Sequence, residues 1–402
     1  MKTFCNKCLY TSSHPLGIII GDDGLCSGCR IHLEKDIIDW EEKHAKLEKI
    51  TSEYKSKKRS LHDCIVPVSG GKDSFFIVHL VKNVLKLNPL LVTYNSQYNS
   101  PTGIRNLSKL TTVFGCDLIK LTLNPRSLGK INRLTFSKLN SVYWHVLAGE
   151  TVFPIQMSVR FKIPLIIWGC HQGIDQVGMF SHHDSVEMTR RYRKDHDLMG
   201  FEPEDFLKEN LLNEEDVFEL LYPSDYELAS CGTRGIYLNN FFRWDSLKQH
   251  EEMIKKYNFE TRTLLNTFDN CNDTHCEIHN TVHDLIKLYK IGYSKITDHI
   301  NREIRFGRID KEGGRFLVDK YEKALSRMKI HKSFESILQI PIDHIKRKVE
   351  SIKTQSNYPN ENYSKKIQDV DEDSAFPIVN NPKYGNDDDR ERPILLGRGW
   401  HD

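Results

Sequence analysis

Short apolar runs alternate with segments of helical spacing through the middle of the chain. Four runs have the length and composition of buried parallel strands, namely residues 64–68, 90–94, 118–123 and 164–168. Residues 104–114, between the second and third runs, have the periodicity of a helix. This alternation predicts an α/β fold with a doubly wound parallel sheet. Ligands of such sheets bind beyond the carboxyl ends of the strands.

A glycine-containing hexapeptide follows the first predicted strand and precedes an apolar helix. Backbone N–H groups at the start of a helix attract anions, and glycine allows a phosphate to approach the backbone. A lysine adds charge, serines add hydroxyl donors, and an aspartate is a suitable ligand for Mg²⁺. The alternative is a glycine turn that binds no phosphate. The predicted phosphate loop is Ser69, Gly70, Gly71, Lys72, Asp73 and Ser74.

This hexapeptide resembles the S-G-G-x-D-S signature of the PP-loop ATP pyrophosphatases, which have an adenine nucleotide alpha hydrolase-like fold. The resemblance implies that ATP is cleaved to an adenylated intermediate and pyrophosphate, with Lys72 and Asp73 as catalytic residues. Tyr94 ends one other predicted strand and Gly169 directly follows another, so we expect both beside ATP.

A second motif follows the fourth predicted strand. The sequence from Gly169 to Asp175 loosely resembles the G-H-x-x-D motif of the same enzymes, with one residue inserted on each side of the histidine. The resemblance implies that His171 contacts the α-phosphate or an oxyanion, and that Asp175 orients a metal or a proton. The alternatives are a loop histidine and an aspartate that caps a helix.

The N-terminus contains two C-x-x-C pairs separated by 17 residues. This spacing is typical of a tetrahedral zinc site with four thiolate ligands, which has no open position and is therefore structural. An iron–sulfur cluster and scattered core cysteines are the alternatives. The predicted ligands are Cys5, Cys8, Cys26 and Cys29.

Composition narrows the class of protein. With 402 residues the chain is long enough for two or three domains, and 39% hydrophobic and 28% charged residues are typical of a soluble globular protein. We expect a cytoplasmic location, because there is neither an apolar run of about 20 residues nor a secretory signal. A formal net charge of +2 does not call for a nucleic-acid partner.

Two longer runs make the resemblance to a known family more specific. Residues 178–197 and 291–308, together with the cysteine pairs and the phosphate loop, resemble the N-acetyl sugar amidotransferase family of bacterial surface-polysaccharide biosynthesis. The resemblance implies an ATP-dependent C–N ligase of lipopolysaccharide O-antigen or related glycan biosynthesis. Such an enzyme converts the acetamido group of a nucleotide-linked sugar or sugar acid into an acetamidino group. The implied cofactors are ATP, Mg²⁺ and Zn²⁺, and glutaminase and cyclase-like subunits are the implied source of ammonia.

Arginines in these runs are candidates for binding a sugar carboxylate or diphosphate. A solvated basic helix face is the alternative for them. The substrate-binding candidates are Arg190, Arg193, Arg302, Arg305 and Arg308. A second metal site is a further hypothesis, and its irregularly spaced ligands would be Cys271, Cys276 and His279.

Five segments follow from these patterns. They are a zinc knuckle (1–30), a linker helix (31–60), a PP-loop ATP-binding domain with an insertion (61–250), a helical substrate- or partner-binding region (251–350), and a polar tail expected to be flexible (351–402). Two other functions remain open at this point. A tRNA-thiolating PP-loop enzyme would use cysteines such as Cys116 and Cys170, and a zinc-ribbon binding module would carry a degenerate ATPase fold.

Overall fold

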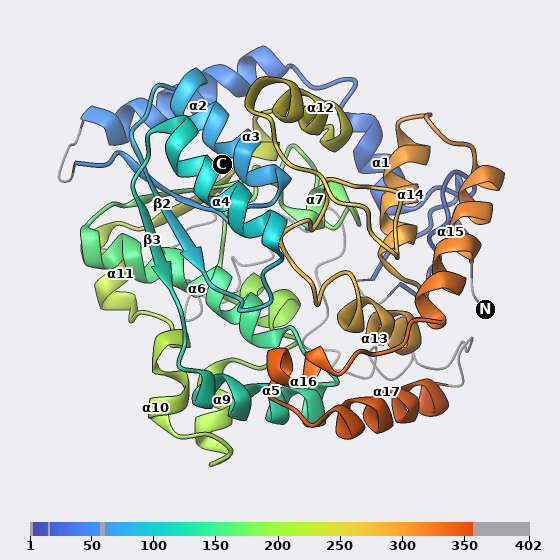
Figure 1. The fold of residues 1–402 in the computed structure, drawn as a ribbon. Helices are drawn as coiled ribbons and strands as arrows, with labels where there is room; N and C mark the ends of the chain where they lie inside the picture. The colour runs from blue at the N-terminus through green and yellow to red at the C-terminus, as the bar shows by residue number, and fades with distance from the viewer. Residues whose placement is uncertain (1–2, 15–16, 57–60, 357–402) are drawn as a thin grey trace.

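Five strands form one parallel sheet (Figure 1). The computed structural model describes residues 3–14, 17–56 and 61–356. The strands lie in the order β3-β2-β1-β4-β5, and each neighbouring pair is parallel. Their bounds are β1 (Cys64–Pro67), β2 (Pro89–Tyr94), β3 (Leu118–Leu121), β4 (Leu165–Trp168) and β5 (Arg234–Tyr237).

The four apolar runs of the sequence form β1 to β4, which confirms the α/β class and the parallel sheet. β5 is an addition that the sequence did not indicate. Its four residues include Arg234 and Gly235, so the apolar run is too short to distinguish from a loop. It becomes a strand because Ile236 pairs with Ile167 and is fully buried in the core.

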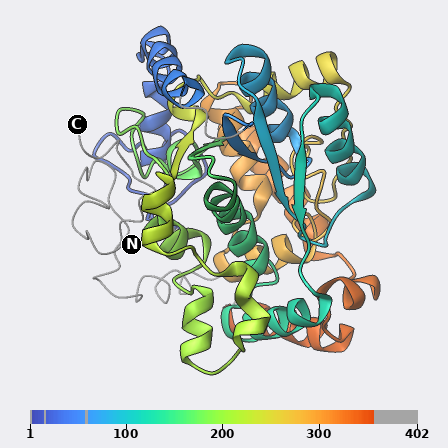
Figure 2. The ribbon, with the colours of Figure 1, turned by 90° about the vertical axis from the view of Figure 1, so that its left-hand side faces the viewer.

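Helices cover both faces of the sheet. Ile65 of β1 belongs to a core shared with helix α6, whereas Val66 faces the opposite way, into a core shared with helix α3. Figure 2 shows the sheet between α6 on one side and α4 on the other. Because both faces are buried, the strands read as continuous apolar runs and not as alternating ones.

The helices differ widely in length. Those before and around the sheet are α1 (Ser27–Glu34), α2 (Trp40–Ser56), α3 (Lys72–His79), α4 (Pro101–Phe114), α5 (Pro125–Leu139), α6 (Trp144–Phe161), α7 (Gln172–Asp175) and α12 (Ser246–Tyr257). Between α7 and α12 lie short helices, α8 (Arg190–Tyr192), α9 (Pro203–Lys208), α10 (Glu214–Val217) and α11 (Asp225–Cys231). The C-terminal helices are α13 (Val282–Ile291), α14 (Lys295–Arg305), α15 (Lys311–Ser326), α16 (Ser333–Leu338) and α17 (Ile342–Ser356). Single π-helical turns span Leu80–Val84 and Arg193–Asp197, and 3₁₀ turns span Phe218–Leu220 and Leu238–Asn240.

Local chemistry sets the ends of the helix between β2 and β3. The Ser100 side chain accepts a hydrogen bond from the Gly103 N–H, and Pro101 occupies the first helical position. Gly115 ends α4 in the left-handed region with φ of +59°, a conformation that glycine adopts without strain.

The predicted linker helix over residues 31–60 is instead two helices. α1 begins at Ser27, inside the knuckle, and the chain turns at residues 35–39 before α2 starts at Trp40. At this turn the Lys35 side chain is buried against residues that follow β4 and β5. Residues 57–60 and 357–402 lie outside the described residues, so the expected flexible tail stays a prediction beyond Ser356.

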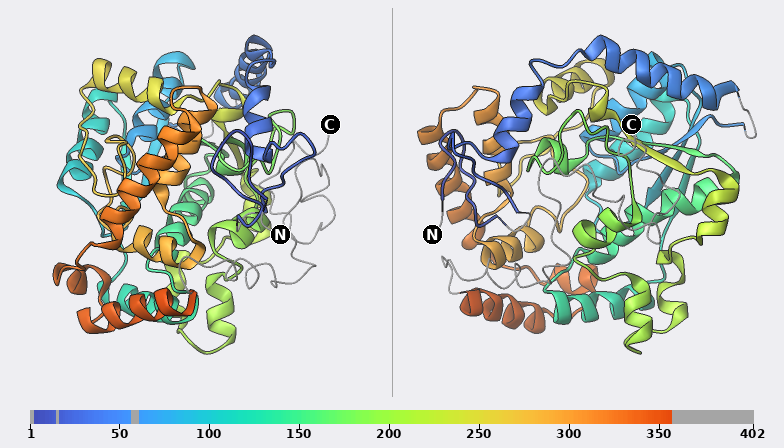
Figure 3. Two further views of the ribbon diagram at one scale, coloured as in Figure 1. Left: turned by 90° about the vertical axis from the view of Figure 1, so that its right-hand side faces the viewer. Right: turned by 180° about the vertical axis from the view of Figure 1, so that it is seen from behind.

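The N-terminal knuckle packs against α7 and α14 and is not a separate module. Its four cysteines share a buried cluster with Ile174 and Ile300. Leu9 N–H donates to Asn301 Oδ1 at 2.7 Å, and the Tyr10 hydroxyl donates to Asp298 Oδ1 at 2.6 Å. Figure 3 shows this segment beside α14 and α15. The knuckle therefore joins the C-terminal helices to the loop after β4.

The chain changes direction between β1 and β4. β2 and β3 are added on one side of β1, and β4 and β5 on the other, with Ile65 paired to Ile166 at the junction. The loops that leave β1 and β4 diverge at such a point and open a crevice beyond the sheet.

Candidate functional site

A cavity of about 950 Å³ lies at the carboxyl ends of β1, β2 and β4. Its volume is near the upper end of the range for ligand pockets, about 300–1,000 Å³, which leaves room for two reactants. From the sheet side, the predicted site residues that line it are Ser69, Lys72, Asp73, Ser74, Tyr94 and Gly169. From the other side, they are Asp175, Arg302 and Arg305.

The predicted phosphate loop connects β1 to α3. Gly71 is the N-cap of α3, so the first-turn N–H groups of the helix belong to residues at the cavity wall. The Ser69 N–H donates to Ser74 Oγ at 3.0 Å, and the Gly71 N–H donates to Ser69 Oγ at 3.3 Å. The serines thus hold the loop closed around the start of a helix, a geometry suited to an anion.

Gly70 is required by the backbone of this loop. Its φ of +78° lies in the left-handed region. A Cβ at this position would also lie 2.7 Å from the Gly103 carbonyl oxygen. Any larger residue would therefore strain the loop and push it away from α4.

Lys72 and Asp73 form an ion pair at the cavity. The Lys72 side chain is buried, and its Nζ donates to Asp73 Oδ1 at 2.7 Å. Burial by itself would raise the pKa of the Asp73 carboxyl, but the Lys72 charge and His250 lower this pKa below its usual value. Asp73 is therefore ionised at neutral pH, and 41% of its side chain is exposed. Such a carboxylate fits the predicted Mg²⁺ ligand.

Tyr94 and Gly169 lie at the cavity wall as expected from the strand ends. The Tyr94 hydroxyl hydrogen-bonds to His145 Nδ1 at 3.0 Å, and burial raises the pKa of this phenol. Tyr94 therefore stays neutral, with its hydroxyl engaged by α6. Gly169 leaves space for Ile77, whose Cδ1 would lie 2.6 Å from an added Cβ.

His171 does not reach the cavity wall. Its ring lies among Phe180, Tyr192 and Tyr237, with ring centroids 4.4–5.4 Å apart. Burial lowers the pKa of this imidazole to about 3, so it is neutral. Among the described residues, the cavity is lined by its neighbour Cys170 and not by His171. This placement does not support the predicted catalytic role.

Asp175 lines the cavity and is held by a residue that the sequence did not single out. The fully buried Lys35 donates from Nζ to Asp175 Oδ1 and, at 3.0 Å, to the Trp244 carbonyl oxygen. Burial raises the pKa of Asp175, but Lys35 outweighs this effect and the net pKa is lowered. In the sequence, Lys35 looks like one of several charged residues of a solvated helix. Only its buried position in the structure shows that it pairs with Asp175.

Arg190 and Arg193 bind the same carboxylate. Arg190 Nη2 lies 2.8 Å from Glu202 Oε2, and Arg193 Nη1 lies 2.7 Å from Glu202 Oε1. Arg193 is completely buried, and neither arginine is among the described residues that line the cavity. Their charges are compensated inside the fold, so the geometry favours an anchoring role over the predicted substrate contact.

Arg302 and Arg308 have different positions. Arg302 lines the cavity, although it also donates to two carboxylates, Asp269 Oδ2 at 2.8 Å and Glu303 Oε1 at 2.7 Å. Arg308 pairs with Asp245 Oδ1 at 2.6 Å and lies outside the described lining residues. Of these two predicted substrate ligands, only Arg302 is in a position to meet a ligand in the cavity.

The four N-terminal cysteines form a candidate metal centre, which confirms the predicted grouping. All four are free thiols and fully buried. The Cys5 and Cys29 sulfurs are 3.9 Å apart, and the Cys8 and Cys26 sulfurs are 3.6 Å apart. Zn–S bonds of about 2.3 Å in a tetrahedron place sulfurs about 3.8 Å apart. The preformed geometry therefore fits zinc without rearrangement.

Arg305 connects this centre to the cavity. Its Nη2 lies 3.9 Å from Cys26 Sγ, and its Nη1 donates to the carbonyl oxygens of Asp175 (3.2 Å) and Gln176 (2.7 Å). A guanidinium beside four thiolates offsets their negative charge. Arg305 was predicted to bind substrate, and its contacts give it this second role as well.

The other hypothetical metal site does not assemble as the sequence suggested. Among the described residues, Cys271, Cys276 and His279 do not form a group of metal-ligand atoms. Cys276 Sγ accepts the His279 N–H at 3.3 Å, and the His279 ring stacks on His283 with centroids 4.9 Å apart. Cys271 instead joins His250 and Asp269.

Two carboxyl groups of the cavity were missed by sequence reasoning. Burial raises the pKa of Glu150 to about 7, partly opposed by His279, and burial raises the pKa of Asp197 to about 7, partly opposed by Arg193. Both line the cavity. Glu150 lies within α6 and carries no motif, so no pattern in the chain marks it.

The fold and the cavity define an α/β protein with a ligand site at the switch point of a parallel sheet. Residues 251–371 match the family model for the C-terminal domain of WbpG-like lipopolysaccharide (LPS) biosynthesis proteins. This segment is therefore similar to a domain of LPS biosynthesis proteins, and it supplies Arg302 and Arg305 to the cavity.

One curated relative matches a slightly shorter part of this chain than the family model does. The uncharacterized protein MJ1599 of Methanocaldococcus jannaschii is 32% identical over 117 residues, which is 29% of this chain and 42% of that protein. The chain thus spans less than half the length of this relative. Within the described part of the chain, no helix combines the length and hydrophobicity needed to cross a membrane.

Proposed function

We propose that this protein is an ATP-dependent amidotransferase that converts the acetamido group of a sugar into an acetamidino group during O-antigen or related glycan biosynthesis. The observation that carries the proposal is where the LPS-matched segment lies. A Cβ on Gly71 would lie 2.9 Å from His275 Nδ1, so this segment lies against the predicted phosphate loop. The predicted phosphate loop and the LPS-matched segment both supply residues to the wall of one cavity.

The first chemical step overcomes the inertness of an amide. Resonance strengthens the amide C–N bond, and oxide is a poor leaving group. The amide oxygen attacks the α-phosphorus of ATP, the bond to the bridging oxygen breaks, and pyrophosphate leaves with that oxygen. The nitrogen loses its proton, which gives an O-adenylated imidate. Ammonia then adds to the imidate carbon, the C–O bond breaks, and AMP leaves the acetamidine.

The residues of the cavity have matching properties. Lys72 and the first-turn N–H groups of α3 stabilise the charge of the departing pyrophosphate. Mg²⁺ held by Asp73 would supply further positive charge to the phosphates. Glu150 and Asp197, with pKa values of about 7, suit acceptance of the amide proton at neutral pH. Arg302, one of two arginines that line the cavity, would meet an anionic group of the sugar nucleotide.

Ammonia requires an outside source in this proposal. Hydrolysis of the imidate by water at ~55 M has to be prevented, and a closed site serves that purpose. We expect glutaminase and cyclase-like partner subunits to deliver ammonia near the end of the sheet that carries Gly169 to Asp175.

A tRNA-thiolating enzyme is the second candidate. Such an enzyme needs cysteines beside the nucleotide, and Cys170 does line the cavity. Burial raises the pKa of Cys170, which disfavours the reactive thiolate. Cys116 contacts the Phe114 carbonyl oxygen and is not among the described lining residues. These contacts favour the amidotransferase.

The test is AMP and pyrophosphate release by the purified chain with ATP, ammonium and candidate acceptors. N-acetyl sugar nucleotides should support release, and Lys72→Ala should abolish it because a charge-assisted contact worth about 2 kcal/mol or more is lost. Lys49→Ala, an exposed lysine of α2, is the matched control and should retain activity. Release with tRNA alone would establish the second candidate, and full activity of Lys72→Ala would refute both.

The nitrogen source is tested separately. Ammonium should support turnover by the isolated chain, whereas glutamine should do so only after the partner subunits are added. Efficient use of glutamine by the chain alone would refute the partner model and direct attention to Cys170 or Cys231.

A further inference from the structure

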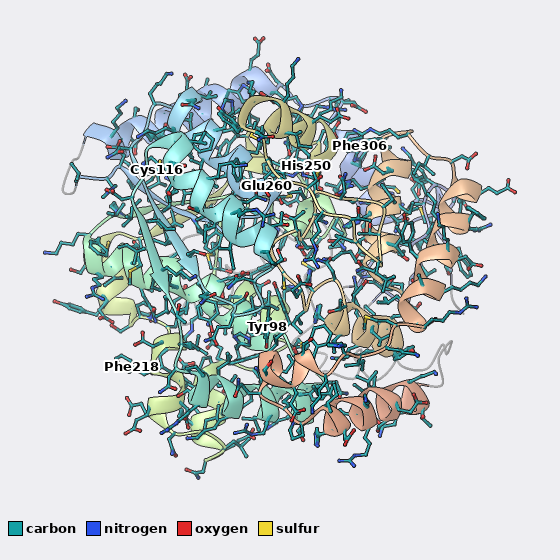
Figure 4. All side chains as sticks on the ribbon, in the orientation of Figure 1. Tyr98, Cys116, Phe218, His250, Glu260 and Phe306 are labelled. Atoms are coloured by element: carbon teal, nitrogen blue, oxygen red, sulfur yellow. The ribbon has the colours of Figure 1, made fainter. Side chains whose placement is uncertain are left out.

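A second group of metal-ligand atoms lies in the interior behind the phosphate loop. It consists of His250 on α12 together with Asp269 and Cys271 from the loop that follows. Their relative exposures are 2%, 8% and 5%, and their ligand atoms all lie within 4.8 Å of one another. Figure 4 labels His250 at α12.

The imidazole of His250 has a ring nitrogen that lacks a hydrogen-bond partner among the described residues. Its Nε2 is buried and makes no hydrogen bond within the described part of the chain. The carboxylate oxygen Asp73 Oδ1 lies 3.9 Å away, beyond hydrogen-bonding distance. A buried polar atom without a partner destabilises the fold, and a bound cation would remove that penalty.

The carboxylate of the group is already oriented. Asp269 Oδ1 accepts the backbone N–H groups of Cys271 and Asn272 at 3.0 and 2.9 Å, and Arg302 donates to Oδ2 at 2.8 Å. Cys271 Sγ contacts Asn270 Oδ1 at 3.3 Å. Hydrogen bonds of this kind hold metal ligands in place in metalloproteins.

We propose that His250, Asp269 and Cys271 bind a divalent ion of the zinc class. A nitrogen, an oxygen and a sulfur donor suit Zn²⁺, whereas Mg²⁺ and Ca²⁺ take oxygen ligands. Bonds of about 2.0–2.3 Å in a tetrahedron separate ligand atoms by about 3.3–3.8 Å, so the group has to contract by no more than about 1.5 Å. Side-chain rotation supplies that movement. Three protein ligands leave a fourth position open.

The surrounding charges are compatible with this ion. The Asp73 and Asp269 carboxylates face Lys72 and Arg302, and Arg302 also pairs with the buried Glu303 carboxylate. Binding of a divalent ion to the Cys271 thiol releases its proton, so the ion adds one net positive charge to this group of paired charges. The site does not depend on the proposed reaction.

The metal content of the purified full chain tests this proposal. The chain is incubated with Zn²⁺ alone, freed of unbound metal by gel filtration, and analysed for zinc and for mass of protein. We expect two ions per chain, one at the N-terminal cysteines and one at the new site. His250→Gln and Cys271→Ser should each reduce the content to one ion. Cys276→Ser, which alters a buried cysteine outside the group, should retain two.

A second readout separates loss of the site from loss of the fold. With Co²⁺ in place of Zn²⁺, Cys271→Ser should lose part of the thiolate-to-cobalt absorption while its circular dichroism stays that of the wild type. His250→Gln should retain thiolate ligation only at the N-terminal centre. One ion per wild-type chain, or two ions in folded His250→Gln and Cys271→Ser, would overturn the proposal whether or not the amidotransferase reaction is found.

Discussion

Replacing Lys35 with methionine should destabilise the protein strongly, although the substitution keeps the apolar stem of the side chain. Lys35 is 2% exposed and its ion-pair partner Asp175 is 17% exposed. Removing one member of a buried ion pair leaves an uncompensated charge and costs about 3–5 kcal/mol. Because Asp175 retains some contact with water in the cavity, we expect the lower figure, about 3 kcal/mol.

That free energy corresponds to a measurable shift in the melting temperature. The unfolding entropy is about 2.1 cal/mol/K per residue, or about 0.7 kcal/mol/K for a folded body of roughly 350 residues. Lys35→Met should therefore melt about 4 °C below the wild type in circular dichroism or differential scanning fluorimetry. Lys49→Met, on the exposed face of α2, is the matched control and should melt with the wild type.

The pH dependence supplies an independent check. Lys35 lowers the pKa of Asp175 in the folded protein, so this carboxylate adds stability above its unfolded pKa and the gain is lost as the pH falls through the folded value. In Lys35→Met the unpaired carboxyl becomes protonated more easily. The difference from wild type should thus be smaller at about pH 5 than at about pH 8.

A double mutant isolates the pair itself. Lys35→Met/Asp175→Asn should be more stable than Lys35→Met, because no buried charge remains unpaired. Equal melting of Lys35→Met and its control, or strictly additive effects of the two substitutions, would refute the ion-pair reasoning.

Three further predictions follow from the same structure. Burial raises the pKa of Glu150 in the folded protein to about 7, so the stability of the protein should fall as the pH rises from about 4.5 to about 7. Glu150→Gln should flatten this part of a plot of melting temperature against pH. An unchanged slope in Glu150→Gln would contradict the prediction. Gly70→Ala should destabilise the protein by about 2–3 kcal/mol in urea unfolding. Gly115→Ala should cost only about 1 kcal/mol, because Gly115 has a similar φ but open space around it. Equal effects of the two substitutions would show that the contact of Gly70 with α4 is unimportant. Cys5→Ser should lose one zinc ion per chain in elemental analysis while Cys231→Ser keeps it, and full zinc content in Cys5→Ser would rule out the four-cysteine centre.

Local patterns in the sequence were sufficient for the elements that depend on neighbouring residues. Strands β1 to β4 are buried on both faces, so each reads as an apolar run, and the hexapeptide beginning at Ser69 lies at a strand-to-helix turn as expected. The four cysteines were found from their spacing, because each C-x-x-C pair places two sulfurs on one turn of chain. β5 was not predicted, because a strand of four residues is too short to show a periodic pattern.

The sequence did not predict which residues the charged and polar side chains contact. Lys35 pairs with a residue 140 positions away, and Arg193 meets Glu202 instead of a ligand. His171 follows β4 as its motif predicts, yet its ring is turned into an aromatic cage, which the packing of distant segments decides.

The sequence by itself therefore determined the α/β class, the order of the first four strands along the chain, the strand-to-helix turn that begins at Ser69, and the grouping of the four cysteines. These depend on propensity, spacing and short-range geometry. The tertiary structure alone decided which arginines line the cavity, which carboxyl groups have raised pKa values, and that His250, Asp269 and Cys271 meet. Burial and charge compensation arise from contacts between segments far apart in the chain, and no local pattern encodes them.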